Sequence, residues 1–97
     1  MAKAAKGPVD ELQREISAIL RERIARRHLV QGAVAKAADI SPSQLSDILG
    51  DKKHIDIGQL DRLCFALDFP LLKLIGQAEE ATASRHAEKT ARAVRAV

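Results

Sequence analysis

The sequence is short of aromatic residues and of cysteine, and both shortages limit what the chain can be. Phe65 and Phe69 are its only aromatic residues, so a core must be aliphatic, which suits packed helices better than a sheet. A single cysteine, Cys64, can form no internal disulfide and cannot supply a zinc site, and it indicates a reducing compartment. Because Cys64 falls between Leu60 and Leu67 at helical spacing, we expect a small buried residue rather than a reactive thiol.

Long apolar runs and enzyme motifs are also missing. No apolar run approaches the roughly 18 residues that a membrane span needs, and none follows the first residues as in a secretory signal. The sequence contains no glycine-rich phosphate loop, no nucleophile with a plausible base and no framed carboxylate pair. His28 and His54 have no cysteine or paired carboxylate at ligand spacing. We therefore expect a cytoplasmic protein that is not an enzyme and holds neither a metal nor a cofactor.

The composition is that of a folded domain with a mild positive charge. The chain has 97 residues, of which 46% are hydrophobic and 30% charged, which fits one domain with flexible ends. Its net charge of +3 is unevenly placed: residues 1–30 carry seven Lys/Arg and four Asp/Glu, and residues 31–77 carry five and six. A basic flank of this kind suits nucleic acid, but it is also typical of a solvated helix end.

Apolar residues spaced by three and four predict an all-α fold of five helices. We expect a flexible arm over 1–8, a domain over 9–76, and a basic, alanine-rich tail over 77–97 that is either helical or dimerising. The expected helices span 9–28, 31–38, 42–49, 56–67 and a short stretch from 70 to 75. The side chains expected in the core are Leu12, Ile16, Ile19, Leu20, Ile24, Val34, Leu45, Ile48, Leu49, Ile57, Leu60, Leu63, Cys64, Leu67, Leu71, Leu72, Leu74 and Ile75.

The start of the third helix is the clearest local signal. Ser41 is a favoured N-cap, and Pro42 follows at the first helical position, where its missing N–H costs nothing. Gln44, three residues after Ser41, completes a predicted capping box, and Gly50 suits the end of the helix. Two short helices joined by about three residues, the second sharply capped, form a helix-turn-helix. In that motif the second helix enters the major groove with its N-terminal residues nearest the bases.

Further positions match a known family at the same spacing. They are Gln31, Val34-Ala35, Ile40-Ser41, Leu45-Ser46, Ile48, Asp51-Lys52-Lys53, Leu60, Leu63, Ala66-Leu67 and Leu74-Ile75. Over Ile16 to Ile75 the sequence thus resembles the lambda-repressor-like domains, the Cro and phage-repressor type of the XRE family. It departs from the family at two positions, because Asp39 and Asp51 stand where glycine is usual in the turn and after the third helix.

The resemblance implies which residues contact DNA. Base-reading positions at the start of the third helix would be Pro42, Ser43, Gln44 and Asp47. Phosphate contacts would come from Gln31, Arg26, Arg27, Ser41, Lys52 and Lys53. Five of these assignments have a plainer alternative: Ser41 and Gln44 serve as caps, Asp47 is a solvated carboxylate, and Lys52 and Lys53 maintain solubility.

Three hypotheses on function follow from these residues. The leading one is a sequence-specific transcriptional regulator, a phage or prophage-type repressor that occupies operator DNA. We expect it to form a homodimer through its fourth and fifth helices or through residues 77–97. The second is an antitoxin that represses its own operon and binds a toxin through residues 1–15 or 77–97, which a neighbouring toxin gene would indicate. The third is a helical protein-interaction module without salt-dependent DNA binding, favoured by the slight acidic excess of residues 31–77.

Overall fold

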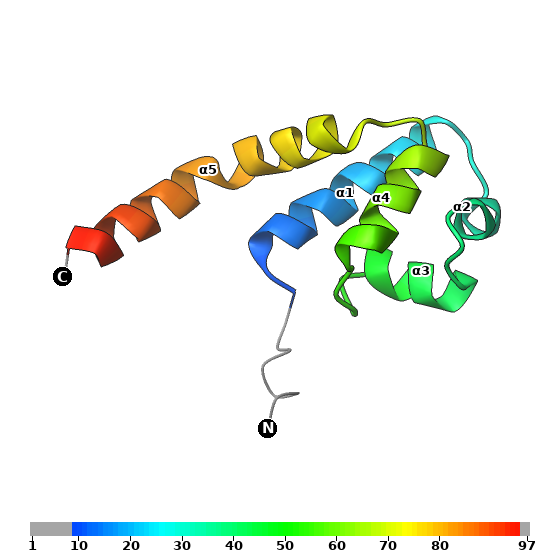
Figure 1. The fold of residues 1–97 in the computed structure, drawn as a ribbon, viewed down its shortest axis with the longest axis horizontal. Coiled ribbons are helices and arrows are strands. Elements are labelled where there is room, and N and C mark those ends of the chain that lie inside the picture. The colour runs from blue at the N-terminus through cyan, green and yellow to red at the C-terminus, as the bar shows by residue number, and fades with distance from the viewer. Residues whose placement is uncertain (1–8, 96–97) are drawn as a thin grey trace, which may run out of the picture.

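The computed structural model describes residues 9–95, with side chains as far as residue 83, and every regular element in this part is a helix. The predicted all-α class is confirmed, whereas the predicted arm over 1–8 lies outside the described residues. Figure 1 shows α2 and α3 together at one end of the molecule and α5 extending past α1 at the other. The helices are α1 (Glu11–Arg26), α2 (Gln31–Ala37), α3 (Pro42–Leu49), α4 (Ile57–Ala66) and α5 (Leu71–Arg95).

Three helices begin at a side-chain cap. Asp10, Ser41 and Asp56 each accept a hydrogen bond from the backbone N–H three residues later, over 3.1, 3.1 and 2.7 Å. In the described residues the reciprocal bond of a capping box is found only at Asp56, whose N–H donates to the side chain of Gln59. The box predicted at Ser41 is therefore half formed, and the carboxamide of Gln44 is not needed to close it.

Four helices end with the same backbone turn, and none of these turns uses glycine. His28, Asp39, Asp51 and Asp68 have φ angles of 55°, 57°, 61° and 54°, while no described glycine has a positive φ. In each turn the next residue's N–H reaches the carbonyl five residues back, over 2.8 to 3.0 Å, which satisfies the last turn of the helix. Gly50 does cap α3, but with a φ of −91°, so the left-handed position falls on Asp51, where the family has glycine.

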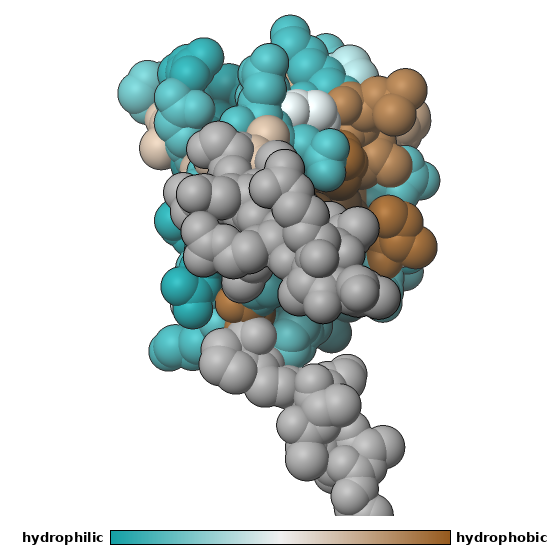
Figure 2. All heavy atoms as spheres, turned by 90° about the vertical axis from the view of Figure 1, so that its left-hand side faces the viewer, coloured by the Kyte–Doolittle hydropathy of each residue, from teal (hydrophilic) through white to brown (hydrophobic). Residues whose placement is uncertain are grey.

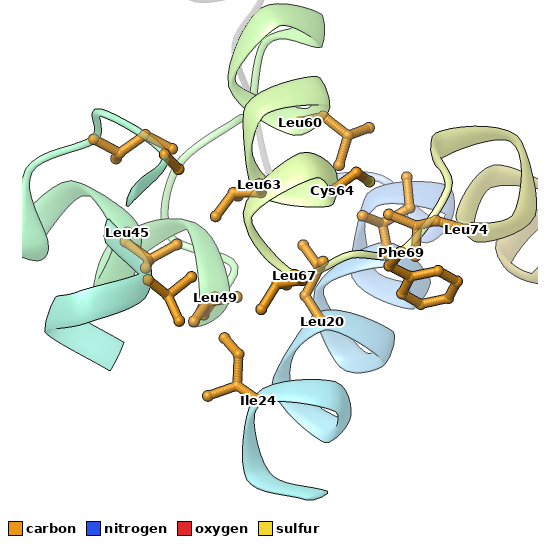
Figure 3. Close-up of a cluster of buried hydrophobic side chains, with 14 of the residues drawn as sticks. Leu20, Ile24, Leu45, Leu49, Leu60, Leu63, Cys64, Leu67, Phe69 and Leu74 are labelled. Atoms are coloured by element: carbon orange, nitrogen blue, oxygen red, sulfur yellow. The ribbon is translucent and has the colours of Figure 1, made fainter. Parts of the chain in front are cut away.

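The core is aliphatic and draws on every helix, as the sequence predicts. Figure 3 shows Leu20 of α1, Leu45 of α3 and Leu63 of α4 pointing into one cluster, and all three are at most 1% exposed. Cys64 is buried at 3% exposure, in agreement with its predicted role as a small core residue. Burying a side chain the size of leucine contributes about 1.5–3 kcal/mol.

Two residues expected in the core are instead on the surface. Ile57 is 71% exposed because it is the first residue of α4 and precedes the buried stripe of that helix. Leu72 is 87% exposed because it lies two residues before the buried Leu74, and two residues at 3.6 per turn reach the opposite side of a helix.

The last helix is much longer than the sequence predicts. The sequence indicates a short helix near residues 70–75 followed by a separate tail, but α5 is one continuous helix of 25 residues. Gly76 is exposed, and Ala78 and Thr82 bury against the domain at 0% and 1% exposure, so the packing against α1 continues beyond residue 76. An alanine side chain buries little area, yet it allows the two helices to approach closely. No helix in the described part is both long and apolar enough to cross a membrane.

Candidate nucleic-acid interface

The helix pair α2–α3 exposes the first turn of α3. The two helices pack against each other and are joined by residues 38–41, where Asp39 provides the left-handed turn. Pro42 and Ser43 are exposed, and Gln44 and Asp47 are half-buried. The opposite side of α3 is anchored in the core. The four predicted base-reading residues thus lie on or beside the outer surface of one short helix.

Gln31 lies at the exposed start of α2. The N-cap of this helix, Val30, has no side chain that can accept a hydrogen bond, so the first amides of the helix lack the side-chain acceptor that other helix starts have. Gln31 is exposed, and the space around Gly32 is open, so a ligand can approach closely.

Two exposed lysines follow α3. Lys52 and Lys53 lie directly after the left-handed Asp51, in the segment that leads to α4. The ammonium Nζ of Lys53 is 3.7 Å from the carboxylate Oδ2 of Asp47, with side-chain exposures of 56% and 37%. A surface ion pair of this kind contributes at most about 1 kcal/mol, so a phosphate can compete for the lysine. The pair also places a positive charge beside the one acidic residue of α3.

Two arginines predicted to contact phosphate have partners within the fold. Arg26 pairs with Glu22 one turn earlier on α1. Arg27 donates from Nη1 to the carbonyl of Leu67 over 2.6 Å and so joins the end of α1 to the end of α4. The exposed Arg26–Glu22 pair contributes as little as the Asp47–Lys53 pair, so a phosphate can compete for Arg26 too, whereas Arg27 is held by a backbone carbonyl of the fold.

A row of polar side chains on α1 holds α3 and the segment after it, and sequence analysis missed this row. Gln13 donates from Nε2 to the carbonyl of Lys53 (2.9 Å) and accepts from the N–H of Ile55 (3.2 Å). Ser17 donates to the carbonyl of Ile48 over 3.2 Å, and Arg21 donates to that of Leu49. The available signal was a spacing of four residues beside the apolar stripe of α1, which puts all three on one face.

Arginines also bind the ends of α2 and α4. Arg62 donates from Nε to the carbonyl of Ala38 over 2.8 Å, next to the turn of the motif. Arg23 donates from Nη2 to the carbonyl of Asp68 over 3.2 Å, and its guanidinium lies 4.5 Å above the ring of Phe69. Cationic donors are favourable at helix C-termini, where carbonyls lack partners. Two of the positively charged residues, Arg23 and Arg62, thus stabilise helix ends within the fold.

Cys64 carries a buried titratable group that lies outside this surface. Burial, and secondarily the nearby Asp61, raises the pKa of the Cys64 thiol, so it stays protonated at neutral pH. Within residues 9–83, whose side chains are described, no cluster of three or more His, Cys, Asp or Glu is arranged to hold a metal ion.

The fold and the exposed start of α3 define a helix-turn-helix DNA-binding domain. The chain belongs to the family of Cro/C1-type HTH DNA-binding domains, which it matches over residues 19–75. Two solved structures of the clp gene regulator ClgR from Corynebacterium glutamicum share the fold. One has a TM-score of 0.69 and 24% identity, covering 90% of this chain and 93% of that chain. The other has a TM-score of 0.66 and 23% identity, covering 75% and 95%. Comparison with curated proteins gives no match.

Proposed function

We propose that the protein is a sequence-specific transcriptional regulator that binds operator DNA and represses by excluding the polymerase, as a phage or prophage-type repressor does. The observation that carries the proposal is the capped, exposed first turn of α3 with two lysines directly after the helix. The solved relatives are described as regulators of clp genes, which supports regulation as the purpose of this fold. Such a regulator works in the cytoplasm, on the nucleoid, and needs no cofactor.

In the proposed complex, α3 lies in the major groove. Ser43 and the half-buried Gln44 and Asp47 face base edges, where glutamine pairs with adenine and aspartate accepts from the cytosine amino group. Pro42 starts the helix and packs against the DNA from the same turn. Since the carboxamide of Gln44 does not close a capping box, it is available to a base.

The proposed phosphate contacts come from residues that precede and follow α3 in the chain. Gln31 lies before α3 in the chain, and Lys52 and Lys53 lie after it. Ser41, exposed at the turn, is both a cap and a phosphate donor in this arrangement. The Asp47–Lys53 ion pair would open when Lys53 moves to phosphate, which leaves the Asp47 carboxylate to a base donor.

Binding to DNA from upstream of the protein's own gene tests this proposal. Affinity should fall about a hundredfold between 50 and 200 mM salt if four phosphates are contacted, and unrelated DNA should compete poorly. Lys52→Ala should weaken binding, whereas Lys73→Ala, the same change on exposed α5, should not. No binding to upstream or genomic DNA at low salt would refute the proposal and favour a protein-binding module.

We further propose that the regulator is a homodimer that uses the surface around the junction of α4 and α5. Phe65, near the end of α4, is 89% exposed, and Leu72, near the start of α5, is 87% exposed. Figure 2 shows hydrophobic side chains gathered along one edge of a face that is otherwise largely hydrophilic in its described part. A single domain reads only a few base pairs, so a second copy provides the specificity that an operator requires.

Light scattering coupled to size-exclusion chromatography tests the dimer. Leu72→Glu should shift the mass from two chains to one, whereas Ile57→Glu, at an exposed isoleucine at the other end of α4, should leave it unchanged. A monomeric wild-type protein would contradict the dimer.

A further inference from the structure

The segment between α3 and α4 has little hydrogen bonding of its own. Lys52 donates its N–H to the carbonyl of Asp47, and the next backbone pairing joins Leu60 to Asp56. Between these points, in the described chain, the backbone of Lys53 to Ile55 is held by the side chain of one residue. That residue is Gln13, which lies 40 positions earlier, on α1.

Gln13 is suited to this task by its chemistry and its burial. It is 9% exposed, and its carboxamide presents a donor and an acceptor side by side. Nε2–H donates to the carbonyl of Lys53 over 2.9 Å, and Oε1 accepts from the N–H of Ile55 over 3.2 Å. A methionine of similar length offers neither bond, and an ionised glutamate can accept but cannot donate. Only an amide of this length satisfies both backbone groups.

We infer that Gln13 is a positioning residue for DNA binding. It fixes the path of the backbone from Lys53 to Ile55 and so holds the ammonium groups of Lys52 and Lys53 beside the end of the groove-facing helix. The inference rests on the proposed function, and it adds a residue of α1 that itself makes no contact with DNA.

The physical effect of Gln13 is preorganisation. Ordering a loop costs conformational entropy, and Gln13 meets that cost during folding instead of during binding. Without Gln13, the lysines would still be present and charged, but the segment that carries them would be less ordered even in the complex, so they would contact fewer phosphates on average. The loss would therefore fall on the phosphate contacts and on their salt dependence.

The test compares Gln13→Met with Gln59→Met. Gln59 also bonds a backbone N–H at the edge of this segment, that of Asp56, so the control removes the same chemical group at the start of α4. We expect Gln13→Met to lower DNA affinity about three- to tenfold near 100 mM salt, and to flatten the log–log salt dependence by about one for each phosphate that the variant no longer binds. Gln59→Met should leave the salt dependence unchanged. Circular dichroism of each variant gives the folded fraction by which the affinities are corrected.

A second variant guards against misfolding of the first. Gln13→Glu keeps the size and the acceptor for Ile55 but loses the donor to Lys53, so it should flatten the salt dependence in the same direction. Hydrogen exchange at the Ile55 amide should become faster in Gln13→Met and change little in Gln59→Met.

Combining the Gln13 substitution with substitutions of both lysines shows whether Gln13 acts through Lys52 and Lys53. In a Lys52→Ala/Lys53→Ala background, Gln13→Met should cause no further loss of affinity. Additive losses, or an unchanged salt dependence of Gln13→Met while the wild type binds, would overturn the role of Gln13 and leave the proposed function intact. If the wild type shows no salt-dependent binding, the proposed function fails and this inference fails with it.

Discussion

Replacing Asp68 with glycine should stabilise the protein. Asp68 follows α4 with a φ of 54°, and a left-handed backbone costs about 1–2 kcal/mol for a residue with a Cβ, toward the lower end for aspartate. Glycine removes this cost but makes the unfolded chain more flexible, which costs about 0.5–1 kcal/mol. The bond from Arg23 survives, because it ends on the backbone carbonyl of Asp68. The net gain should be about 0.5 kcal/mol, or a rise in Tm of about 2–4 °C for a domain of this size.

Thermal unfolding followed by circular dichroism, together with urea unfolding, measures this gain. Asp61→Gly is the matched control, since it makes the same change at an exposed position inside α4. There glycine should lower stability by about 0.3–0.5 kcal/mol, because it is the poorer helix former. The change in the free energy of unfolding should therefore have opposite signs in the two variants. A loss of stability in Asp68→Gly would refute the claim that backbone strain at this turn outweighs the entropy of glycine.

Three further predictions concern the core, a helix end and the buried thiol. Leu20→Ala should cost about 2–5 kcal/mol in urea unfolding, because Leu20 is fully buried, whereas Leu72→Ala in a monomeric background should change stability by less than about 0.5 kcal/mol. Arg62→Met should cost about 0.5–1.5 kcal/mol through the bond to the carbonyl of Ala38, and an unchanged unfolding midpoint would show that this bond contributes nothing. The raised pKa of Cys64 means that the folded state favours the protonated thiol. This preference contributes fully to the free energy of unfolding below the ordinary pKa of 9.0, and the contribution is lost as the pH rises through the raised pKa. Between pH 8 and 10 the wild type should therefore lose more stability than Cys64→Ala, and equal losses would contradict this account.

The helix starts and the core could be predicted from the sequence because their signals are local. Ser41 and Pro42 act within one turn of chain, and the structure begins α3 at Pro42. The aliphatic stripes repeat within single helices, so most of the core follows from periodicity alone. The exposed first turn of α3 follows in turn, since a helix with one buried face must present the other to solvent.

The contacts that hold the interface could not be predicted, because their partners are far apart in sequence. Gln13 meets Lys53 across 40 residues, and Arg27 meets Leu67 across the same separation. Nothing local distinguishes Arg27, which binds a carbonyl of the fold, from an arginine that is available to phosphate. The length of α5 was missed for a related reason: Ala78 and Thr82 count as weak core residues until α1 is placed against them.

Because α5 is continuous, the direction in which its C-terminal half faces, relative to the rest of the domain, depends on the number of residues between them. Twenty-five residues at 1.5 Å each form a rod of about 37 Å, and the twelve residues after Ala83 account for about 18 Å of it. Each residue inserted after Ala83 would turn everything beyond it by about 100° relative to the DNA-binding domain, while seven inserted residues would nearly restore the original direction. A partner bound at the C-terminal end of α5 would therefore have a fixed orientation relative to α3, because one continuous helix connects them.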